Sequence, residues 1–401
     1  MVRDKIIPKG YKKTVIGVIP EDWGVKKYGE ILEYEQPTKY LVNTKILETG
    51  NTPVLTAGKS IILGYTNETT GVYENTPVII FDDFTTSSKY IDYDFKVKSS
   101  AMKFLKIDNS QNSLRYYSAL MQIQDFNVAS HKRHWISEYS NLLAPYPKPK
   151  EQTAIANVFF KVDGLIENLA NLIQKKRRIK KGVMQELLTG KGRLPGFDGE
   201  WEERKLGEIG DISGSGVNKK IIPGEKPVRL VNFMDVYKRN FIYSKDLYHE
   251  VTSPFNKAAK CAVNKGDVFF TPTSETQDDI GFSAVAMEDI SDGVYSYHVV
   301  RLRLREPWNL LYRAYAFKTA DFYNQAGKYS QGSGTRYVIT QADFAEINVK
   351  YPSDAEEQKA IASTIFQMDQ EINHLQKLKH KYQLIKQGMM QQLLTGKIRL
   401  I

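Results

Sequence analysis

Four polar segments hold the side chains of this chain best suited to binding a ligand through hydrogen bonds. Their hydroxyl, amide, imidazole and cationic groups supply donors and acceptors, which is the chemistry of recognition. The segments form two pairs: the first of each follows an apolar run, 78–81 or 268–270, and the second precedes Ile136 or Ile339. We therefore expect loops at one face in each half of the chain, although an ordinary solvated loop is the alternative for each segment. The candidate residues are Thr85, Thr86, Ser87, Ser88, Lys89, Tyr90, His131, Lys132, Arg133, His134, Thr271, Thr273, Ser274, Gln277, Gln331, Ser333, Thr335 and Arg336.

Sequence motifs for catalysis on nucleic acids are absent. No Pro-Pro dipeptide occurs, which excludes the Asn/Asp-Pro-Pro-aromatic motif of amino-methyltransferases, and no Pro-Asp dipeptide starts the usual nuclease carboxylate set. Gly58-Lys59-Ser60 resembles the end of a phosphate loop, but Pro53 occupies the place of the required first glycine. These absences favour a binding protein over an enzyme.

Metal ligands are also not indicated. His131 and His134 are three residues apart, but the neighbouring Lys132 and Arg133 would repel a bound cation, so we expect no metal site. Cys261 is the only cysteine, which excludes a disulfide framework and indicates a reducing compartment. No apolar run approaches the roughly 20 residues that span a membrane, and no signal core follows the N-terminus, so we expect a cytoplasmic protein.

The charge balance favours an anionic partner. The 401 residues carry a formal net charge of +10. Such an excess attracts polyanions such as DNA, although a merely solvated basic surface is the alternative interpretation.

One segment of about 44 residues occurs twice. Residues 151–194 and 357–400 align without a gap at an offset of 206, and a direct count gives 23 identical positions of 44. A shorter echo precedes each copy: Trp23, Lys27, Gly29, Glu30 and Ile31 recur as Trp201, Lys205, Gly207, Glu208 and Ile209. Each half therefore joins a variable module to a constant one, which suggests that something symmetric is bound by the constant parts.

The repeated segments have the apolar periodicity of a coiled coil. Apolar residues recur at alternating steps of four and three, which predicts two helices of about 37 residues and about 55 Å. A long helix with one apolar stripe needs a partner, and the other copy is the obvious one. The predicted seam comprises Ile155, Phe159, Val162, Ile166, Leu169, Ile173, Ile361, Ile365, Met368, Ile372 and Leu375.

Glycines punctuate both helices at matched positions. Gly190 and Gly396 follow Leu-Leu-Thr and predict the two C-terminal ends. Gly182 and Gly388 lie inside the helices, where they indicate close helix approach, a bend, or simple inheritance from the duplication. The basic run 175–181 is a solvated face or a phosphate-tracking surface; its counterpart is much less basic.

The variable modules have the β-rich runs and turn signals of mixed α/β domains. We expect strands at 78–81, 268–270 and 299–304 and short helices at 113–123 and 309–320. The predicted fold is α+β, with two pseudo-symmetric halves whose long helices pair as an antiparallel coiled coil. The predicted boundaries are 1–150 for the first variable module, 151–195 for the first helical region, 196–352 for the second variable module and 353–401 for the second helical region.

This layout resembles the specificity subunit of type I restriction–modification systems. The resemblance rests on Ile19-Pro20-Glu21-Asp22-Trp23, on Gly199-Glu200-Trp201, on Glu-Gln-x-x-Ile-Ala at both helix starts and on Leu-Leu-Thr-Gly-Lys at both helix ends. It implies a bipartite, asymmetric DNA site, with one half read by each recognition domain. It also implies two adenine-N6 methyltransferase subunits and the ATP-dependent restriction/translocase subunits as partners, with S-adenosylmethionine, ATP and Mg belonging to those partners.

Two other interpretations stay open at this point. One is the specificity subunit of a related multi-subunit system that cuts on both sides of its site. The other is a coiled-coil scaffold that binds no DNA, which fits the duplicated helices but not the two large divergent modules.

Overall fold

The structure is a computed structural model that describes residues 7–56, 61–107, 112–124, 126, 133–334 and 336–400. The chain divides into two compact units, Met1–Asn171 with Gln376–Ile401 and Leu172–Leu375. Each unit therefore combines one variable module with parts of both long helices. Within the described ranges, no helix has the length and apolar character needed to cross a membrane.

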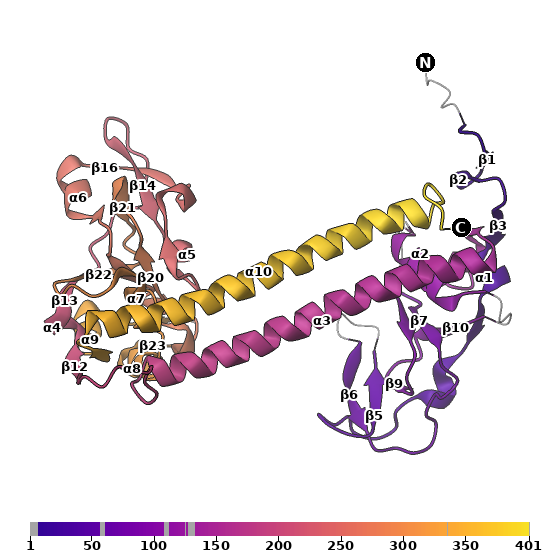
Figure 1. The fold of residues 1–401 in the computed structure, drawn as a ribbon, viewed down its shortest axis with the longest axis horizontal. Helices are drawn as coiled ribbons and strands as arrows, with labels where there is room; N and C mark the ends of the chain where they lie inside the picture. Colours follow the sequence, from indigo (N-terminus) through magenta and orange to yellow (C-terminus); the bar gives the residue numbers. More distant parts are fainter. Residues whose placement is uncertain are drawn as a thin grey trace. The chain divides into compact units, whose positions relative to one another are not determined.

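The first unit contains a small β-rich module (Figure 1). Its main sheet has the order β4-β10-β7-β8, and a three-stranded sheet has the order β6-β5-β9. Two-stranded ribbons pair β1 with β2 and β11 with β3. The strands are β1 Tyr11–Thr14, β2 Gly17–Pro20, β3 Gly24–Lys27, β4 Glu33–Glu35, β5 Thr52–Leu55, β6 Ile62–Thr66, β7 Val78–Asp82, β8 Ser88–Ile91, β9 Lys96–Val97, β10 Met102–Lys106 and β11 Leu143–Tyr146; the helices are α1 Tyr28–Ile31 and α2 Leu114–Ile123.

The second unit has a larger module built on the same plan. A five-stranded sheet has the order β13-β22-β18-β20-β15, and a four-stranded sheet has the order β16-β14-β21-β17. A three-stranded sheet β19-β24-β23 and the ribbon β12-β25 complete it. The strands are β12 Trp201–Lys205, β13 Gly210–Ser213, β14 Lys226–Val231, β15 Phe241–Ile242, β16 Glu250–Ser253, β17 Ala262–Val263, β18 Val268–Phe270, β19 Thr273–Ser274, β20 Ser283–Ala286, β21 Ile290–Tyr295, β22 Val300–Leu304, β23 Gln331–Ser333, β24 Arg336–Val338 and β25 Asn348–Pro352; the helices are α4 Leu206–Ile209, α5 Phe233–Val236, α6 Phe255–Lys260, α7 Leu310–Arg313, α8 Ala320–Tyr329 and α9 Gln341–Ala345.

The two repeats form helices of equal length, α3 Pro149–Leu187 and α10 Ala355–Leu393, of 39 residues each. Gly190 and Gly396, which follow their ends, have φ values of +71° and +70°. A Cβ at Gly190 would meet the ring of Trp201, and one at Gly396 would meet Pro20 and Trp23. Left-handed backbone and close packing thus both require glycine at these ends, as predicted.

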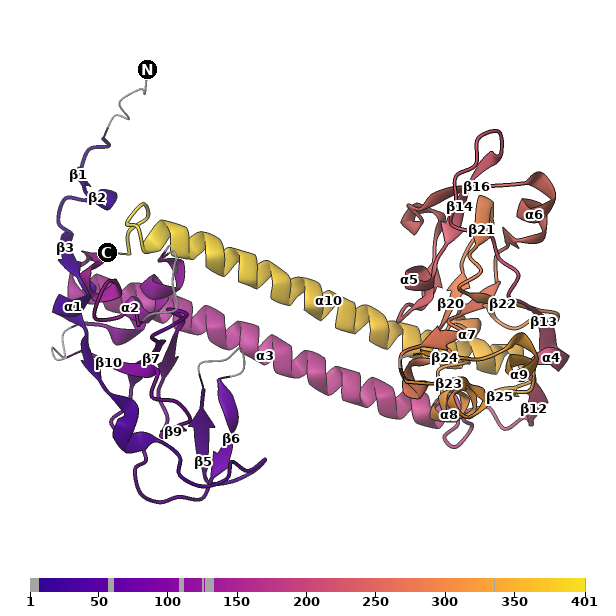
Figure 2. The same cartoon turned by 180° about the vertical axis from the view of Figure 1, so that it is seen from behind.

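Within each unit the two helices lie side by side and run in opposite directions (Figures 1 and 2). In the second unit Lys176 pairs with Glu371 and Lys180 with Asp369, so the partner number falls as the residue number rises. In the first unit Lys386 pairs with Asp163, with 2.7 Å between Nζ and Oδ1. This pair is the repeat equivalent of Lys180–Asp369, because both residues differ by the offset of 206. The predicted α+β fold with antiparallel long helices is confirmed.

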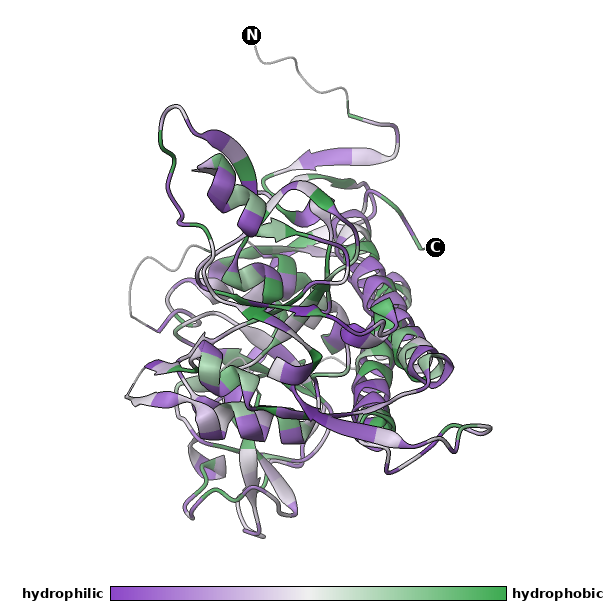
Figure 3. Ribbon diagram, turned by 90° about the vertical axis from the view of Figure 1, so that its left-hand side faces the viewer, coloured by the Kyte–Doolittle hydropathy of each residue, from purple (hydrophilic) through white to green (hydrophobic). Residues whose placement is uncertain are grey.

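The predicted seam residues lie on the packed side of the helices, and none of the eleven is exposed. Green and purple segments alternate along both helices in Figure 3, as a single apolar stripe requires. Each helix start also packs into a module: Ile155 and Phe159 join the core of the first module, and Ile361 and Ile365 join that of the second.

A buried glutamate fastens each helix start to the end of the other helix. Glu151 accepts hydrogen bonds from Nε and Nη2 of Arg399, at 2.6 and 2.8 Å, and from the indole of Trp23 at 2.9 Å. Glu357 makes the equivalent bonds with Arg193, at 2.6 and 2.7 Å, and with Trp201 at 3.4 Å. Because these residues all recur in both copies, the repeat encodes two matching clamps. The Glu of each Glu-Gln motif is explained by this contact.

The neighbouring glutamine serves the same junction. Gln152 donates to the carbonyl of Pro147, and Gln358 donates to that of Pro352. The side-chain oxygen of Gln152 accepts from the backbone of Ser113, the N-cap of α2, and that of Gln358 accepts from Asn309, the N-cap of α7. Each helix start therefore positions a short helix of its module.

The shorter echo forms the entry to each module. Glu30 and Glu208 cap the short helices α1 and α4 by accepting from the backbone N–H of Lys27 and Lys205. A Cβ at Gly29 would lie 3.2 Å from Ser140. A Cβ at Gly207 would lie 3.1 Å from Ala345, which explains why glycine recurs here.

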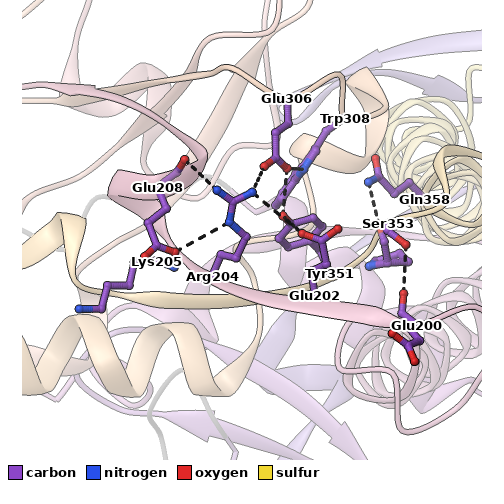
Figure 4. Close-up of polar contacts among 11 residues, drawn as sticks. Glu200, Glu202, Arg204, Lys205, Glu208, Glu306, Trp308, Tyr351, Ser353 and Gln358 are labelled. Atoms are coloured by element: carbon purple, nitrogen blue, oxygen red, sulfur yellow. Dashed lines mark hydrogen bonds and ion pairs between the residues drawn. The ribbon is translucent and has the colours of Figure 1, made fainter.

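A polar cluster holds the β12–β25 ribbon beside the start of α10 (Figure 4). Tyr351 donates to Glu306 at 2.9 Å, and Trp308 donates to the same carboxylate at 3.1 Å. Arg204 forms an ion pair with Glu306, and Ser353 bonds to the carbonyl of Glu200 at 3.2 Å. These contacts join β12, β25 and the segment between β22 and α7.

Two sequence interpretations need correction. The single helix expected at 309–320 is wrong: α7 ends at Arg313, and α8 begins at Ala320 after Thr319, whose side chain accepts from Phe322 N–H. Between the two helices, Tyr315 and Phe317 are fully buried in the core, so packing of these side chains is favoured here over a continuous helix. Close helix approach at Gly182 and Gly388 is also not found, because no described atom lies within 4 Å of a Cβ built at either glycine.

Candidate nucleic-acid interface

The first predicted segment of module 1 is the turn and second strand of a hairpin. Thr85 donates to Asp82 at 2.7 Å, and Thr86 has a φ of +58°. The loop expected through residue 90 is corrected, since Ser88, Lys89 and Tyr90 pair with β7 in strand β8. Thr85, Ser87 and Lys89 are exposed and remain able to contact a ligand.

The second predicted segment of module 1 meets the same hairpin. The backbone N–H of His134 donates to the carbonyl of Asp83 at 2.9 Å, and that of Trp135 to its carboxylate at 2.8 Å. The His134 side chain is 1% exposed and contacts Glu138 and Phe126, which removes it from the candidate contacts. Arg133 is exposed, whereas His131 and Lys132 lie outside the described residues.

The two predicted segments of module 2 form one sheet. Thr273 pairs with Val338 and Ser274 with Tyr337, which joins β19 to β24. Thr271 is a correction: it is fully buried, and its hydroxyl accepts from Phe282 N–H at 3.0 Å. The other predicted residues fall as follows: Gln277, Gln331 and Arg336 are exposed, Thr273 and Ser274 are half-buried, the Ser333 backbone lies in β23, and Thr335 and the Ser333 side chain are not described.

A groove of about 700 Å³ borders this sheet. Three of the predicted residues line it, Thr273, Ser274 and Arg336. The remaining lining residues are the sequence neighbours of Ser274 and residues from more distant segments of the module. They comprise Lys219, Phe233, Tyr237, Glu275, Thr276, Asp279 and His298.

One side of the groove is cationic and free of carboxylate partners. Arg229, Arg303 and Arg305 of the same module each pair with an aspartate, but among the described residues no carboxylate pairs with Lys219 or Arg336. Burial lowers the pKa of His298 below its ordinary 6.5, and the charges of Lys219 and Arg336 lower it further. An anion in the groove would therefore find two unpaired cations and a histidine that gains a proton more readily once the anion is bound.

The other side of the groove combines aromatic and acidic groups. The rings of Phe233 and Tyr237 stack at 5.4 Å, and the Tyr237 hydroxyl donates to Asp279 at 2.9 Å. Lys238 lies 4.6 Å from the Tyr237 ring. The arrangement offers hydrogen-bond donors and acceptors to a polar ligand.

Sequence reasoning missed the residues that tertiary contacts add to this groove. A signal existed for Lys219, which follows the Gly- and Ser-rich stretch 213–216. The backbone N–H of Val217 donates to the carbonyl of Tyr295 and the carbonyl of Val217 accepts from the N–H of Tyr297, which holds this loop next to His298. His298 lies in no recognisable motif. A single histidine in a sequence is most often structural, so it gave no signal of a binding role.

A second candidate surface lies on the exposed side of each long helix. Four identical positions recur with helical spacing, and no described atom lies within 4 Å of a Cβ built at the glycine of either set. Ile179 is 44% exposed, its equivalent Ile385 is 38% exposed, and Leu172 is 38% exposed, whereas its equivalent Leu378 is half-buried. The surface comprises Leu172, Lys175, Ile179 and Gly182 on α3, and Leu378, Lys381, Ile385 and Gly388 on α10; we call these the matched helix faces.

The basic run 175–181 has a partly structural role. Lys176 and Lys180 make the interhelix ion pairs described above. Within the described chain no group of three His, Cys, Asp or Glu side chains is placed to hold a metal ion.

Comparison with known proteins identifies a family. The model of the type I restriction modification DNA specificity domain matches residues 20–176 and 198–384, one match in each half. A 223-residue alignment is 43% identical to the type I restriction enzyme EcoR124I/EcoR124II specificity subunit of Escherichia coli and covers 52% of this chain. This chain thus spans about half the length, 53%, of that relative.

Two further comparisons cover more than nine-tenths of the chain. The type I restriction enzyme MjaVIII specificity subunit of Methanocaldococcus jannaschii is 24% identical over 412 residues, with 95% of this chain and 94% of the relative covered. The crystal structure of a type I restriction-modification S subunit from M. genitalium has a TM-score of 0.59 and 16% identity, and covers 92% of this chain and 96% of that one. At this identity the structural likeness shows the fold alone.

Proposed function

Because the chain belongs to the family of type I restriction–modification DNA specificity proteins, as its sequence motifs indicated, we propose that it reads a bipartite, asymmetric DNA site, one half with each module. The chain is a specificity subunit, a recognition component rather than a catalytic one. The observation that carries the proposal is the groove of module 2, where two predicted segments come together with Lys219 and Arg336, two cations that no carboxylate of the described residues pairs with. Cations attract the phosphate backbone, and side chains of this kind also reach base edges.

The duplicated helices support a second part of the proposal, the recruitment of two methyltransferase subunits. The matched helix faces carry the same four residues in the same order, so one kind of partner fits both. Apolar side chains next to an exposed glycine suit the close approach of a protein surface, whereas phosphate contacts would need only the lysines. The restriction/translocase subunits join through the same complex.

The cofactors belong to the partners in this proposal. S-adenosylmethionine, ATP and Mg are bound by the methyltransferase and translocase subunits, and the chain alone neither methylates nor cuts DNA. The alternative, a related multi-subunit system that cuts on both sides of its site, uses the same recognition modules.

A module exchange tests the proposal. Residues 15–150 are replaced by the first module of another specificity subunit, and the chain is co-expressed with its methyltransferase partner. Sequencing of the methylated adenines should show a change in one half of the site only. A change in both halves, or methylation by the purified chain without a partner, would contradict the proposed division of labour.

A further inference from the structure

We infer that Glu275 is a specificity-determining residue, which together with Arg336 reads a C·G base pair in the half-site of module 2. The inference rests on the proposed function and assigns chemistry to the groove described above. Both side chains line that groove and both are exposed.

Glu275 presents a free carboxylate. It follows Ser274, whose strand is fixed by pairing with β24, and the Ser274 hydroxyl accepts from the backbone N–H of Thr276 at 3.2 Å. The other acid of the groove, Asp279, is occupied by Tyr237 at 2.9 Å and lies 3.9 Å from Lys238. In the described structure no ion pair engages Glu275.

A carboxylate in a DNA-binding groove has few acceptable ligands. It is acceptor-only, so phosphate oxygens repel it and cannot bond to it. The exocyclic amino groups that base pairs present in the major groove, cytosine N4 above all, are its suitable partners. A groove that bound DNA only through its charge would be weakened by Glu275, so this residue is better explained by base reading.

Arg336 supplies the complementary chemistry. Its guanidinium can donate two hydrogen bonds to guanine O6 and N7, the commonest specific contact in the major groove. The β23–β24 pairing places Arg336 opposite Ser333, and Gly332, with a φ of +143°, pairs with Tyr337 in the same ribbon. An acceptor for cytosine and a donor for guanine in one groove match the two members of a single C·G pair.

Selection from a random duplex pool tests the inference. The full chain, with its methyltransferase partner, selects 30-base-pair duplexes, and the bound pool is sequenced for wild type, Glu275→Gln and Glu250→Gln. Glu250 is an exposed carboxylate outside the groove, so its substitution controls for the loss of one negative charge. We expect one C·G position in one half-site, at which Glu275→Gln lowers the preference about tenfold. Its affinity for random DNA should not fall, and Glu250→Gln should leave every position unchanged.

A modified base tests the arginine contact at the same position. Replacing the guanine by 7-deazaguanine removes the N7 acceptor and should weaken wild-type binding, but should weaken Arg336→Ala no further. If wild type selects a sequence but Glu275→Gln alters no position, or lowers all affinities equally, the inference fails. If wild type selects no sequence, the proposed function fails instead.

Discussion

Arg399 donates two hydrogen bonds to Glu151, a residue 248 positions earlier in the chain. The same guanidinium also pairs with Asp22, at 2.9 Å. These contacts raise the pKa of Arg399 above its ordinary value, chiefly through the hydrogen bond to Glu151. The end of one repeat is thereby fixed to the start of the other and to the entry of module 1.

The clamp should be a major source of stability. Arg399→Ala would leave the buried Glu151 carboxylate without its cation, which costs about 3 kcal/mol or more. Urea titration should show the loss as a lower unfolding midpoint, and Arg193→Ala should behave alike in the other unit. Arg178→Ala, an exposed helix position, is the control and should change stability little; equal effects of all three substitutions would show that the clamp contributes nothing special.

The two sides of α10 and α3 should respond differently to charge. Ile372→Asp places a carboxylate in the packed seam, where Ile372 is 6% exposed, and should cost several kcal/mol. Ile179→Asp lies on a matched helix face and should leave thermal unfolding of the isolated chain nearly unchanged while weakening assembly with the methyltransferase. Melting curves and co-purification measure the two effects, and a wild-type melting curve for Ile372→Asp would refute the seam.

The helix-interior glycines should be replaceable in the isolated chain. A Cβ at Gly182 or Gly388 meets no described atom, so alanine should stabilise each helix by about 0.5–1 kcal/mol. Gly182→Leu should keep the fold but obstruct a closely packed partner. Chemical unfolding and co-purification with the methyltransferase separate the two results; destabilisation by alanine would mean that the chain itself uses the glycine.

Arg336 and Lys89 should differ in what they contribute to DNA binding. Arg336→Ala should weaken binding to the cognate duplex more than to random DNA, because base contacts discriminate by about 1–3 kcal/mol. Lys89→Ala should weaken both alike and lower the salt slope by about one unit, as a phosphate contact does. Binding titrations on both duplexes at several salt concentrations test these expectations. If Arg336→Ala lowers the affinities for cognate and random DNA equally, Arg336 contacts the phosphate backbone instead of a base.

His298 should make stability depend on pH. Its folded-state pKa lies below the ordinary 6.5, so the unfolded state takes up the proton first. The contribution of His298 to the free energy of unfolding is therefore fully present above pH 6.5, and it decreases as the pH falls towards the folded-state pKa. The free energy of unfolding, measured between about pH 5 and 8, should depend less on pH in His298→Gln than in the wild type. DNA binding should show the opposite trend and tighten at lower pH, because phosphates favour the protonated ring.

The helices, their ends and their pairing were readable from local patterns. Ile155 and Ile372 lie on a stripe with a four–three spacing, and Gly190 and Gly396 end the helices where a left-handed residue is needed. The duplication also marked Glu151 and Glu357 as repeated, although only the structure shows that arginines from the other copy bind them.

The sequence by itself determined the two-module plan, the long helices and the polar segments that follow buried strands, because periodicity and repetition are local properties. Only the tertiary structure decided which polar side chains face outward. Strand pairing buried Thr271 and drew Tyr90 into β8, whereas packing enclosed His134. The tertiary structure also brought Lys219 and His298 to Arg336. Strands distant in the sequence pair according to the whole sheet, and this pairing has no local signature in the sequence.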